Sequence, residues 1–147
     1  MYRKILVPVD GSATATKGLR EAIQLAKDQK ARLRLVHVVD ESMAIGVAES
    51  GVQLEPMIDG LVENGRHILD RAARAAEKAG VKAEAQLYES MSGPAASAIL
   101  RDAKKWGADV IVMGTHGRRG IRRVVMGSDA EHVLRETPVP VLVVRGR

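Results

Sequence analysis

The sequence predicts a single α/β domain, covering residues 1–147, with a doubly wound parallel sheet of five strands and four helices. Short runs of β-branched and aliphatic residues alternate with longer segments of helical period, as in βαβ units. The first run, from Lys4 to Val9, is almost continuously apolar, which suits a strand buried on both faces. With 147 residues and 46% hydrophobic residues, the chain is long enough for one buried core.

The elements follow from the period of the apolar residues and from the glycine and proline positions between them. Strands are expected at residues 4–9, 32–39, 82–88, 109–113 and 139–144, and helices at residues 13–30, 54–80, 95–106 and 128–136. Residues 41–53 contain two glycines and no clear period, which predicts a loop. The right-handed crossover rule then leaves a Rossmann-like, doubly wound arrangement.

Local signals place the individual boundaries. Pro8 cannot donate to a sheet ladder, so it belongs near the end of the first strand. Gly80 is a good stop for the long helix, and Pro94 suits the first turn of the next one. Residues 82–88 alternate polar and apolar side chains, which indicates a strand near an edge of the sheet.

Composition excludes several classes of function. The chain has no cysteine, which excludes disulfides, zinc ribbons, iron–sulfur clusters and thiol nucleophiles. Its three aromatic residues, Tyr2, Tyr88 and Trp106, argue against a stacking platform for single-stranded nucleic acid. No apolar stretch approaches the roughly 20 residues of a membrane span, and the N-terminal apolar run is too short for a signal peptide. A cytosolic location is therefore expected.

Positive charge is concentrated in the last third of the chain. Residues 1–100 carry 13 basic and 13 acidic residues, whereas residues 101–147 carry ten basic and five acidic residues. Arg118, Arg119, Arg122 and Arg123 lie within one loop. Such a local cationic loop indicates one binding place for an anionic ligand.

The glycine-rich segment after the fourth strand is the strongest functional signal. Gly114, Gly117 and Gly120 allow backbone N–H groups to approach an anion, and Gly127-Ser128 opens a helix whose N-terminus favours phosphate. A plain turn, with Ser128 as a helix cap, is the alternative. Because the glycine spacing, the buried strand and the arginines coincide, we favour an anion site. Neither a Walker A motif nor a G-x-G-x-x-G motif is present, which argues against a P-loop NTPase and an NAD dehydrogenase.

The segment Gly114-x2-Gly117-x9-Gly127-Ser128 resembles the nucleotide-binding signature of the universal stress protein family, in which G-2x-G-9x-G precedes Ser or Thr. Residues 5–12, 35–39 and 138–144 are similar to the first, second and last strands of that family. Gly93 stands where the family keeps a glycine before the third helix, although Pro94 follows it directly. The resemblance covers essentially the whole chain.

The resemblance implies an ATP-binding member of the family, with ADP or AMP as alternative nucleotides. By position, Asp10 would face the ribose and phosphates or a metal ion, Mg²⁺ or Mn²⁺. Val9, Val38 and Met113 would line the adenine pocket. The nucleotide-binding residues expected on this basis are Pro8, Val9, Asp10, Val38, Met113, Gly114, His116, Gly117, Arg118, Gly127, Ser128 and Asp129. Replacing Gly114 and Gly117 with valine is expected to abolish binding and leave the fold intact.

No catalytic residue is assigned. His116 could contact phosphate or act in acid–base chemistry, and the sequence leaves these roles and a structural role open. Neither a Ser/His/Asp triad nor a general base facing a γ-phosphate can be named. We therefore expect a nucleotide-binding stress sensor or regulator with at most slow ATP hydrolysis.

Two other functions compete with this hypothesis. An adenine-nucleotide α-hydrolase would carry a Ser-Gly-Gly-x-Asp-Ser loop, of which only Asp10-Gly11-Ser12-Ala13 is present. A nucleic-acid-binding protein could use the arginines at residues 118–123, but the first 100 residues are neutral.

The resemblance also implies a homodimer formed through the last strand, from Val139 to Val144. Charge on Arg145 and Arg147 is the alternative protection of that edge.

Overall fold

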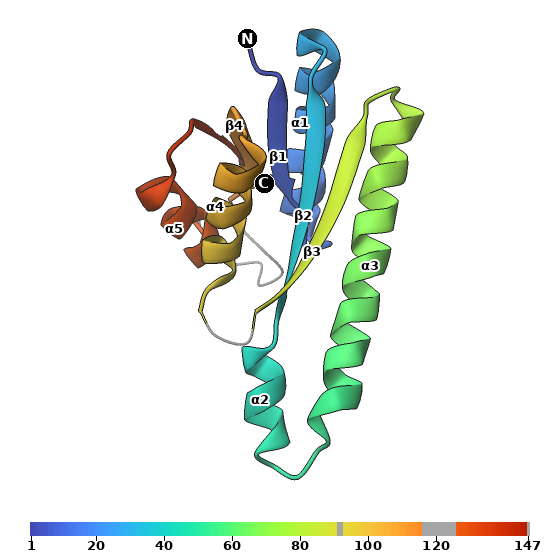
Figure 1. Cartoon of the computed structure of the whole chain (residues 1–147), viewed down its shortest axis with the longest axis vertical. Coiled ribbons are helices and arrows are strands. Elements are labelled where there is room, and N and C mark those ends of the chain that lie inside the picture. The colour runs from blue at the N-terminus through green and yellow to red at the C-terminus, as the bar shows by residue number, and fades with distance from the viewer. Residues whose placement is uncertain (91–92, 116–125, 147) are drawn as a thin grey trace.

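The computed structural model describes residues 1–90, 93–115 and 126–146 (Figure 1). Five parallel strands form one sheet in the order β3-β2-β1-β4-β5. The strands are β1 (Lys4–Pro8), β2 (Arg32–Asp40), β3 (Ala83–Ser90), β4 (Val110–Gly114) and β5 (Val141–Val144). The helices are α1 (Ala13–Gln29), α2 (Ser42–Ala48), α3 (Leu54–Lys78), α4 (Ala95–Trp106) and α5 (Ser128–Glu136). The expected doubly wound α/β fold is confirmed.

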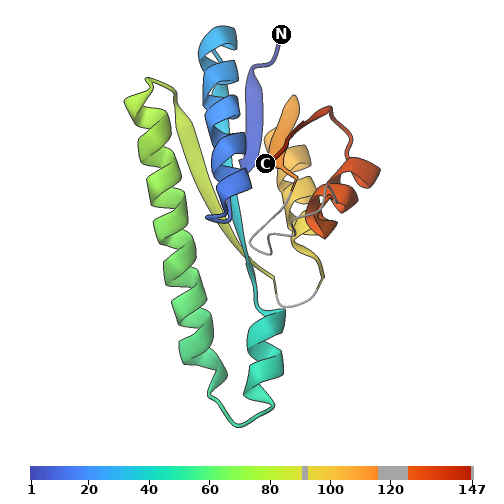
Figure 2. The same ribbon diagram turned by 180° about the vertical axis from the view of Figure 1, so that it is seen from behind.

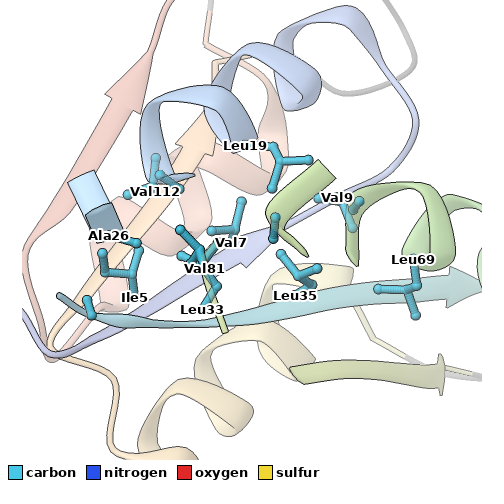
Figure 3. Close-up of a cluster of buried hydrophobic side chains, with 14 of the residues drawn as sticks. Ile5, Val7, Val9, Leu19, Ala26, Leu33, Leu35, Leu69, Val81 and Val112 are labelled. Carbon is cyan, nitrogen blue, oxygen red and sulfur yellow. The ribbon is translucent and has the colours of Figure 1, made fainter. Parts of the chain in front are cut away.

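Helices cover both faces of the sheet (Figures 1 and 2). Helices α1 and α3 pack on one face, and α4 and α5 lie on the other. Figure 3 shows the core under α1 and α3, where Ile5, Val7 and Val9 of the first strand and its extension meet Leu33 and Leu35 of β2. Because both faces of β1 are covered, Ile5, Leu6 and Val7 are all fully buried, as the continuous apolar run predicts.

The predicted loop at residues 41–53 is wrong, because it contains the additional helix α2. This helix has only seven residues and no side-chain cap, so its sequence carries no strong local signal. Ala44 is buried, and the helix packs against α3, so its formation depends on tertiary contact. The structure therefore has five helices in its described residues, where the sequence predicts four.

A buried polar network joins the sheet to α4. Arg34 of β2 donates through Nε and Nη2 to the two carboxylate oxygens of Asp102, at 3.0 and 2.9 Å. Tyr88 of β3 donates its hydroxyl hydrogen to the same carboxylate, and Glu84 accepts from Arg34 Nη1 at 3.1 Å. The Asp102 side chain is completely buried, so its charge is compensated by these donors rather than by water.

Among the described helices, none combines the length and the apolar character that a bilayer crossing requires.

Candidate functional site

The strand order places a topological switch point between β1 and β4. From β1 the chain continues to β2 and β3 on one side, and it returns through β4 to β5 on the other side. The helices that follow β1 and β4 lead away from their carboxyl ends in different directions, which opens a crevice at this edge. The candidate site therefore lies where β1 and β4 end (Figure 2).

Asp10 lies at this edge, two residues beyond the end of β1. Its carboxylate Oδ1 accepts a hydrogen bond from the Ser12 N–H at 2.8 Å, and Gly11 between them has a φ of +82°. Ser12 is the N-cap of α1, where its hydroxyl accepts from the Ala15 N–H at 3.2 Å. Asp10 therefore forms a turn at the start of α1, and the same turn holds its carboxylate at the strand end.

His37 of β2 supports the chain immediately before Asp10. Its Nδ1 lies 2.7 Å from the carbonyl oxygen of Val9, so Nδ1 carries the proton and the carbonyl accepts it. Gly65 of α3 lies directly against this ring, since a Cβ there would come within 2.6 Å of His37 Cδ2. His37 therefore has a structural role.

The two described ends of the glycine-rich segment meet at the end of β4. Thr115 donates its backbone N–H to Val144 of β5, and its carbonyl accepts the backbone N–H of Gly127. Gly127 is the N-cap of α5, so Ser128 is the first residue of the helix and does not cap it. The segment thus leaves and returns at one point, beside the positive N-terminal end of α5. His116, Gly117 and Arg118 lie outside the described residues.

Gly114 has a structural requirement that the sequence does not show. An added Cβ would lie 2.7 Å from the carbonyl carbon and 2.8 Å from the carbonyl oxygen of Thr14, near the start of α1. These are backbone atoms that cannot rotate away, so a side chain there would push α1 off β4. The expectation that Gly114 can be changed to valine with the fold intact is wrong.

The predicted pocket residues do not all share one face. Val38 and Met113 pack with the core under α4 and α5, and Pro8 is on this face because side chains alternate along β1. Val9 instead packs with the core under α1 and α3, where it is buried (Figure 3). Pro8, Val38 and Met113 are therefore the predicted residues that could contact one ligand through their side chains, whereas Val9 would contribute its backbone.

The Asp129 carboxylate is influenced by two other acidic side chains at this edge. Desolvation and then the charges of Asp10 and Asp40 raise the pKa of Asp129, although Asp129 as a residue is exposed. His132 and a hydrogen bond from the backbone N–H of Ala96 act in the opposite direction. Asp129 therefore links α5 to the first turn of α4, and an additional positive charge at this edge would stabilise its ionised form.

The described residues contain no group of three or more His, Cys, Asp or Glu side chains arranged to hold a metal ion. A hard cation such as Mg²⁺ usually takes only one or two protein carboxylates and completes its shell with phosphate and water. The second oxygen of the Asp10 carboxylate receives no hydrogen bond from the described residues, so it fits such a single-carboxylate role.

Two residues of this edge were missed by the sequence predictions. Asp40 ends β2 and contributes to the electrostatics of Asp129, and Thr14 carries the backbone against which Gly114 packs. The position of Asp40 directly after an apolar strand was a usable signal, equivalent to that of Asp10. The position of Thr14 was not, because only the packing of α1 on β4 brings it there.

The fold and this edge define a doubly wound α/β protein with its switch point between β1 and β4, which is where proteins of this class bind their ligands. The family model described as "Universal stress protein family" matches residues 1–145. The chain belongs to this family, as the glycine spacing indicates.

Individual relatives agree with this assignment. Universal stress protein MJ0531 of Methanocaldococcus jannaschii is 37% identical over 145 residues, covering 99% of this chain and 83% of that protein. Universal stress protein YxiE of Bacillus subtilis is 35% identical over 151 residues, covering 99% of this chain and all of its own length. The solved structure of MJ0577 of M. jannaschii superposes with a TM-score of 0.86 at 28% identity, covering 100% of this chain and 98% of that one.

Other solved structures with this fold hold adenine nucleotides. The universal stress protein from Archaeoglobus fulgidus in complex with dAMP has a TM-score of 0.72 at 24% identity, covering 97% of this chain and 98% of that one. A family protein from Arabidopsis thaliana with AMP bound has a TM-score of 0.71 at 16% identity, covering 99% and 92%.

Proposed function

We propose that this chain binds an adenine nucleotide, with ATP as its physiological ligand, in the crevice between the carboxyl ends of β1 and β4. The observation that carries the proposal is the hydrogen bond between Gly127 and Thr115, which joins both ends of the glycine-rich segment beside the N-terminus of α5. Backbone N–H groups at such a place attract phosphate. The adenine nucleotides held by the A. fulgidus and A. thaliana proteins of the same fold support the choice of base.

Each predicted residue has a part in this proposal. Pro8, Val38 and Met113 contact the adenine and Val9 provides backbone groups, while Asp10 faces the ribose and the phosphates. The phosphates contact the glycine-rich segment and the start of α5, through Gly114, His116, Gly117, Arg118, Gly127, Ser128 and Asp129.

Asp10 is the proposed protein ligand for Mg²⁺ or Mn²⁺ accompanying the nucleotide. Bound there, the ion would neutralise phosphate charge, and the phosphate oxygens and water would complete its shell. Asp10 holds its carboxylate in place through the bond from the Ser12 N–H. No protein base facing the phosphates is assigned, so we propose nucleotide-dependent regulation in a cytoplasmic stress response, with at most slow hydrolysis.

The proposal includes a homodimer formed through β5. This strand is an edge of the sheet, and its Leu142 side chain is 43% exposed. An edge strand with an apolar outer side is a natural place for pairing with a second copy. Light scattering at micromolar concentration should give twice the chain mass, and a monodisperse monomer would remove this part of the proposal.

The first experiment identifies the nucleotide. Protein purified without added nucleotide is denatured, and released compounds are identified by chromatography and mass spectrometry. Calorimetry with ATP, ADP and AMP, with and without Mg²⁺, then gives the preference. An empty protein that also ignores added Mg-ATP would overturn the proposal. The reaction products distinguish the two hydrolytic activities. Slow formation of ADP would indicate weak ATPase activity, whereas AMP and pyrophosphate would indicate an α-hydrolase.

Variants then locate the site. Gly117→Val and Ser128→Asp should each weaken ATP binding at least tenfold, because the first blocks the approach of the phosphates and the second adds a negative charge beside them. Ser50→Asp, at an exposed position after α2, is the matched charge control and should bind ATP normally. Unchanged affinity in Gly117→Val and Ser128→Asp would place the nucleotide elsewhere.

A further inference from the structure

A helical hairpin extends beyond the carboxyl edge of the sheet (Figures 1 and 2). It consists of α2 and the first part of α3, and we call residues 41–64 the prong. We call the rest of the described residues the body. Figure 1 shows the two helices of the prong extending from the body side by side, with a turn at their far end. The prong lies outside the proposed nucleotide site, and nothing in the proposed function uses it.

The apolar stripe of α3 runs through the prong without being fully covered. In the part of α3 over the sheet, Gly65, Ile68, Leu69, Ala72 and Ala76 are buried. In the prong, the same stripe continues with residues that are only half-buried, namely Leu54, Met57, Ile58, Leu61 and Val62. The short helix α2 is the element that covers this part. An apolar stripe that continues past its own sheet leaves surface for another apolar group.

Two valines of the prong are still more open. Val47 on α2 is 43% exposed, and Val52 in the turn between the helices is 48% exposed. Both belong to the few large apolar side chains that are exposed in the described residues. Together with the half-buried stripe, they place the uncovered apolar surface of α2 and α3 in one region of the molecule.

The prong is also the most acidic region of a basic protein. Residues 41–64 contain Glu41, Glu49, Glu55, Asp59 and Glu63 and no Lys, Arg or His, while the chain as a whole has a net charge of +5. Glu49, Glu55, Asp59 and Glu63 are exposed, and the three on α3 are spaced four residues apart, so they form an acidic rim along one side of the apolar stripe. An apolar surface with an acidic rim is complementary to an apolar stripe with a basic rim.

We infer that the prong is a docking surface for a basic amphipathic helix of a partner protein. The leucines and isoleucines of such a helix pack on the half-buried stripe of α3 and on Val47 and Val52, while its lysines and arginines face the acidic rim. From Leu54 to Val62 the stripe is about 12 Å long, which a helix of about three turns covers. The prong of a second copy does not fit, because it brings five more negative charges.

The test uses two synthetic peptides of identical composition. One 18-residue peptide has leucines at positions i, i+3, i+4 and i+7 and lysines elsewhere, and the other has its leucines spread around the helix. Binding of each labelled peptide to the full chain is followed by fluorescence anisotropy at about 0.15 M salt, where attraction by charge alone is screened beyond roughly 8 Å. The amphipathic peptide should bind at least tenfold more tightly than its scrambled counterpart.

Paired variants separate the prong from the rest of the surface. Val47→Ser combined with Val52→Ser should raise the Kd of the amphipathic peptide about tenfold, whereas Leu134→Ser, at an exposed apolar position on α5, should leave it unchanged. Asp59→Lys should also weaken binding, while Glu21→Lys on α1 makes the same change of charge at another exposed position and should not. Thermal unfolding of each variant checks that the fold is kept.

Three results would overturn the inference. The first is equal binding of both peptides, and the second is peptide binding that is unchanged in the prong variants. The third is self-association of the chain that is lost in the Val47→Ser and Val52→Ser variant, because the partner would then be a second copy of the chain. The nucleotide assay is independent, so failure of the docking inference and failure of the proposed nucleotide site are distinguishable.

Discussion

The two halves of α3 have the same apolar pattern but different surroundings. The C-terminal half packs on β2 and β3, and the N-terminal half packs on α2 beyond the sheet. Two glycines show the difference. A Cβ at Gly65 would meet the His37 ring at 2.6 Å, whereas a Cβ at Gly60 would meet nothing within 4 Å. The helical period therefore predicts that a helix forms, but it does not predict how tightly its surroundings constrain it.

The largest effect is expected in the body of the protein, at Asp102. Asp102→Ala removes the carboxylate that pairs with Arg34 and accepts from Tyr88, and it leaves a largely buried guanidinium without its main partner. The free energy of unfolding should fall by about 3 kcal/mol in urea denaturation. Asp70→Ala, which breaks an exposed pair with Arg74 on α3, should change it by less than about 1 kcal/mol. Equal effects would mean that the buried network does not stabilise the body.

The same carboxylate should make the stability of the body depend on pH. Burial would raise the pKa of Asp102, but hydrogen bonds from Arg34 and Tyr88 and nearby positive charge outweigh it, so the pKa is lowered. In the acid range, Asp102 therefore binds a proton more readily in the unfolded chain than in the folded one. The free energy of unfolding falls as the pH decreases from the pKa of Asp102 in the unfolded chain, about 3.9, through its lower pKa in the folded protein. Urea denaturation between about pH 2 and 6 should show a steeper loss for the wild type than for Asp102→Asn.

A smaller loss is expected where α3 packs on the sheet. Gly65→Ala forces the new methyl group against His37, whose ring is held by its bond to the Val9 carbonyl. Such overpacking costs about 1–3 kcal/mol of unfolding free energy. Nuclear magnetic resonance of the His37 ring should show a changed environment. An unchanged stability would show that α3 can shift away from β2 easily.

The smallest effect has the opposite sign and lies in the prong. Gly60→Ala replaces a glycine in the interior of α3 at a position where nothing is in the way, and alanine is the better helix former. The free energy of unfolding should rise by about 0.5–1 kcal/mol, or less if the prong unfolds separately from the body. Hydrogen exchange of α2 and α3 distinguishes these two results.

Much of the fold follows from the sequence because the strands carry strong local patterns. Helices α4 and α5 begin and end as predicted, and the five strands are present in the expected order along the chain. Strand β3 continues to Ser90, beyond its predicted end, because it pairs with β2 as far as Asp40. Strand β5 begins later than predicted, after Pro140, which has no N–H to donate.

The candidate site is less predictable, because it depends on approaches between distant segments. The position of Asp10 at the edge follows from its place after β1. The side of the sheet on which Val9 packs, and the contact of Gly114 with Thr14, come from the packing of α1. A glycine motif therefore reports two requirements together, a possible ligand contact and a close approach of two backbones, and only the structure separates them at Gly114.

The position of Gly146, the last described residue, has a practical consequence for labelling. It lies against α1, since a Cβ there would be 2.3 Å from Thr14 Cγ2. Met1, by contrast, is 96% exposed and precedes the amino end of β1, at the opposite edge of the sheet from Asp10. A purification tag or fluorophore attached at Met1 therefore points into solvent far from the crevice. A group attached directly after Gly146 would instead start beside Thr14 in the first turn of α1, close to the crevice proposed for the nucleotide.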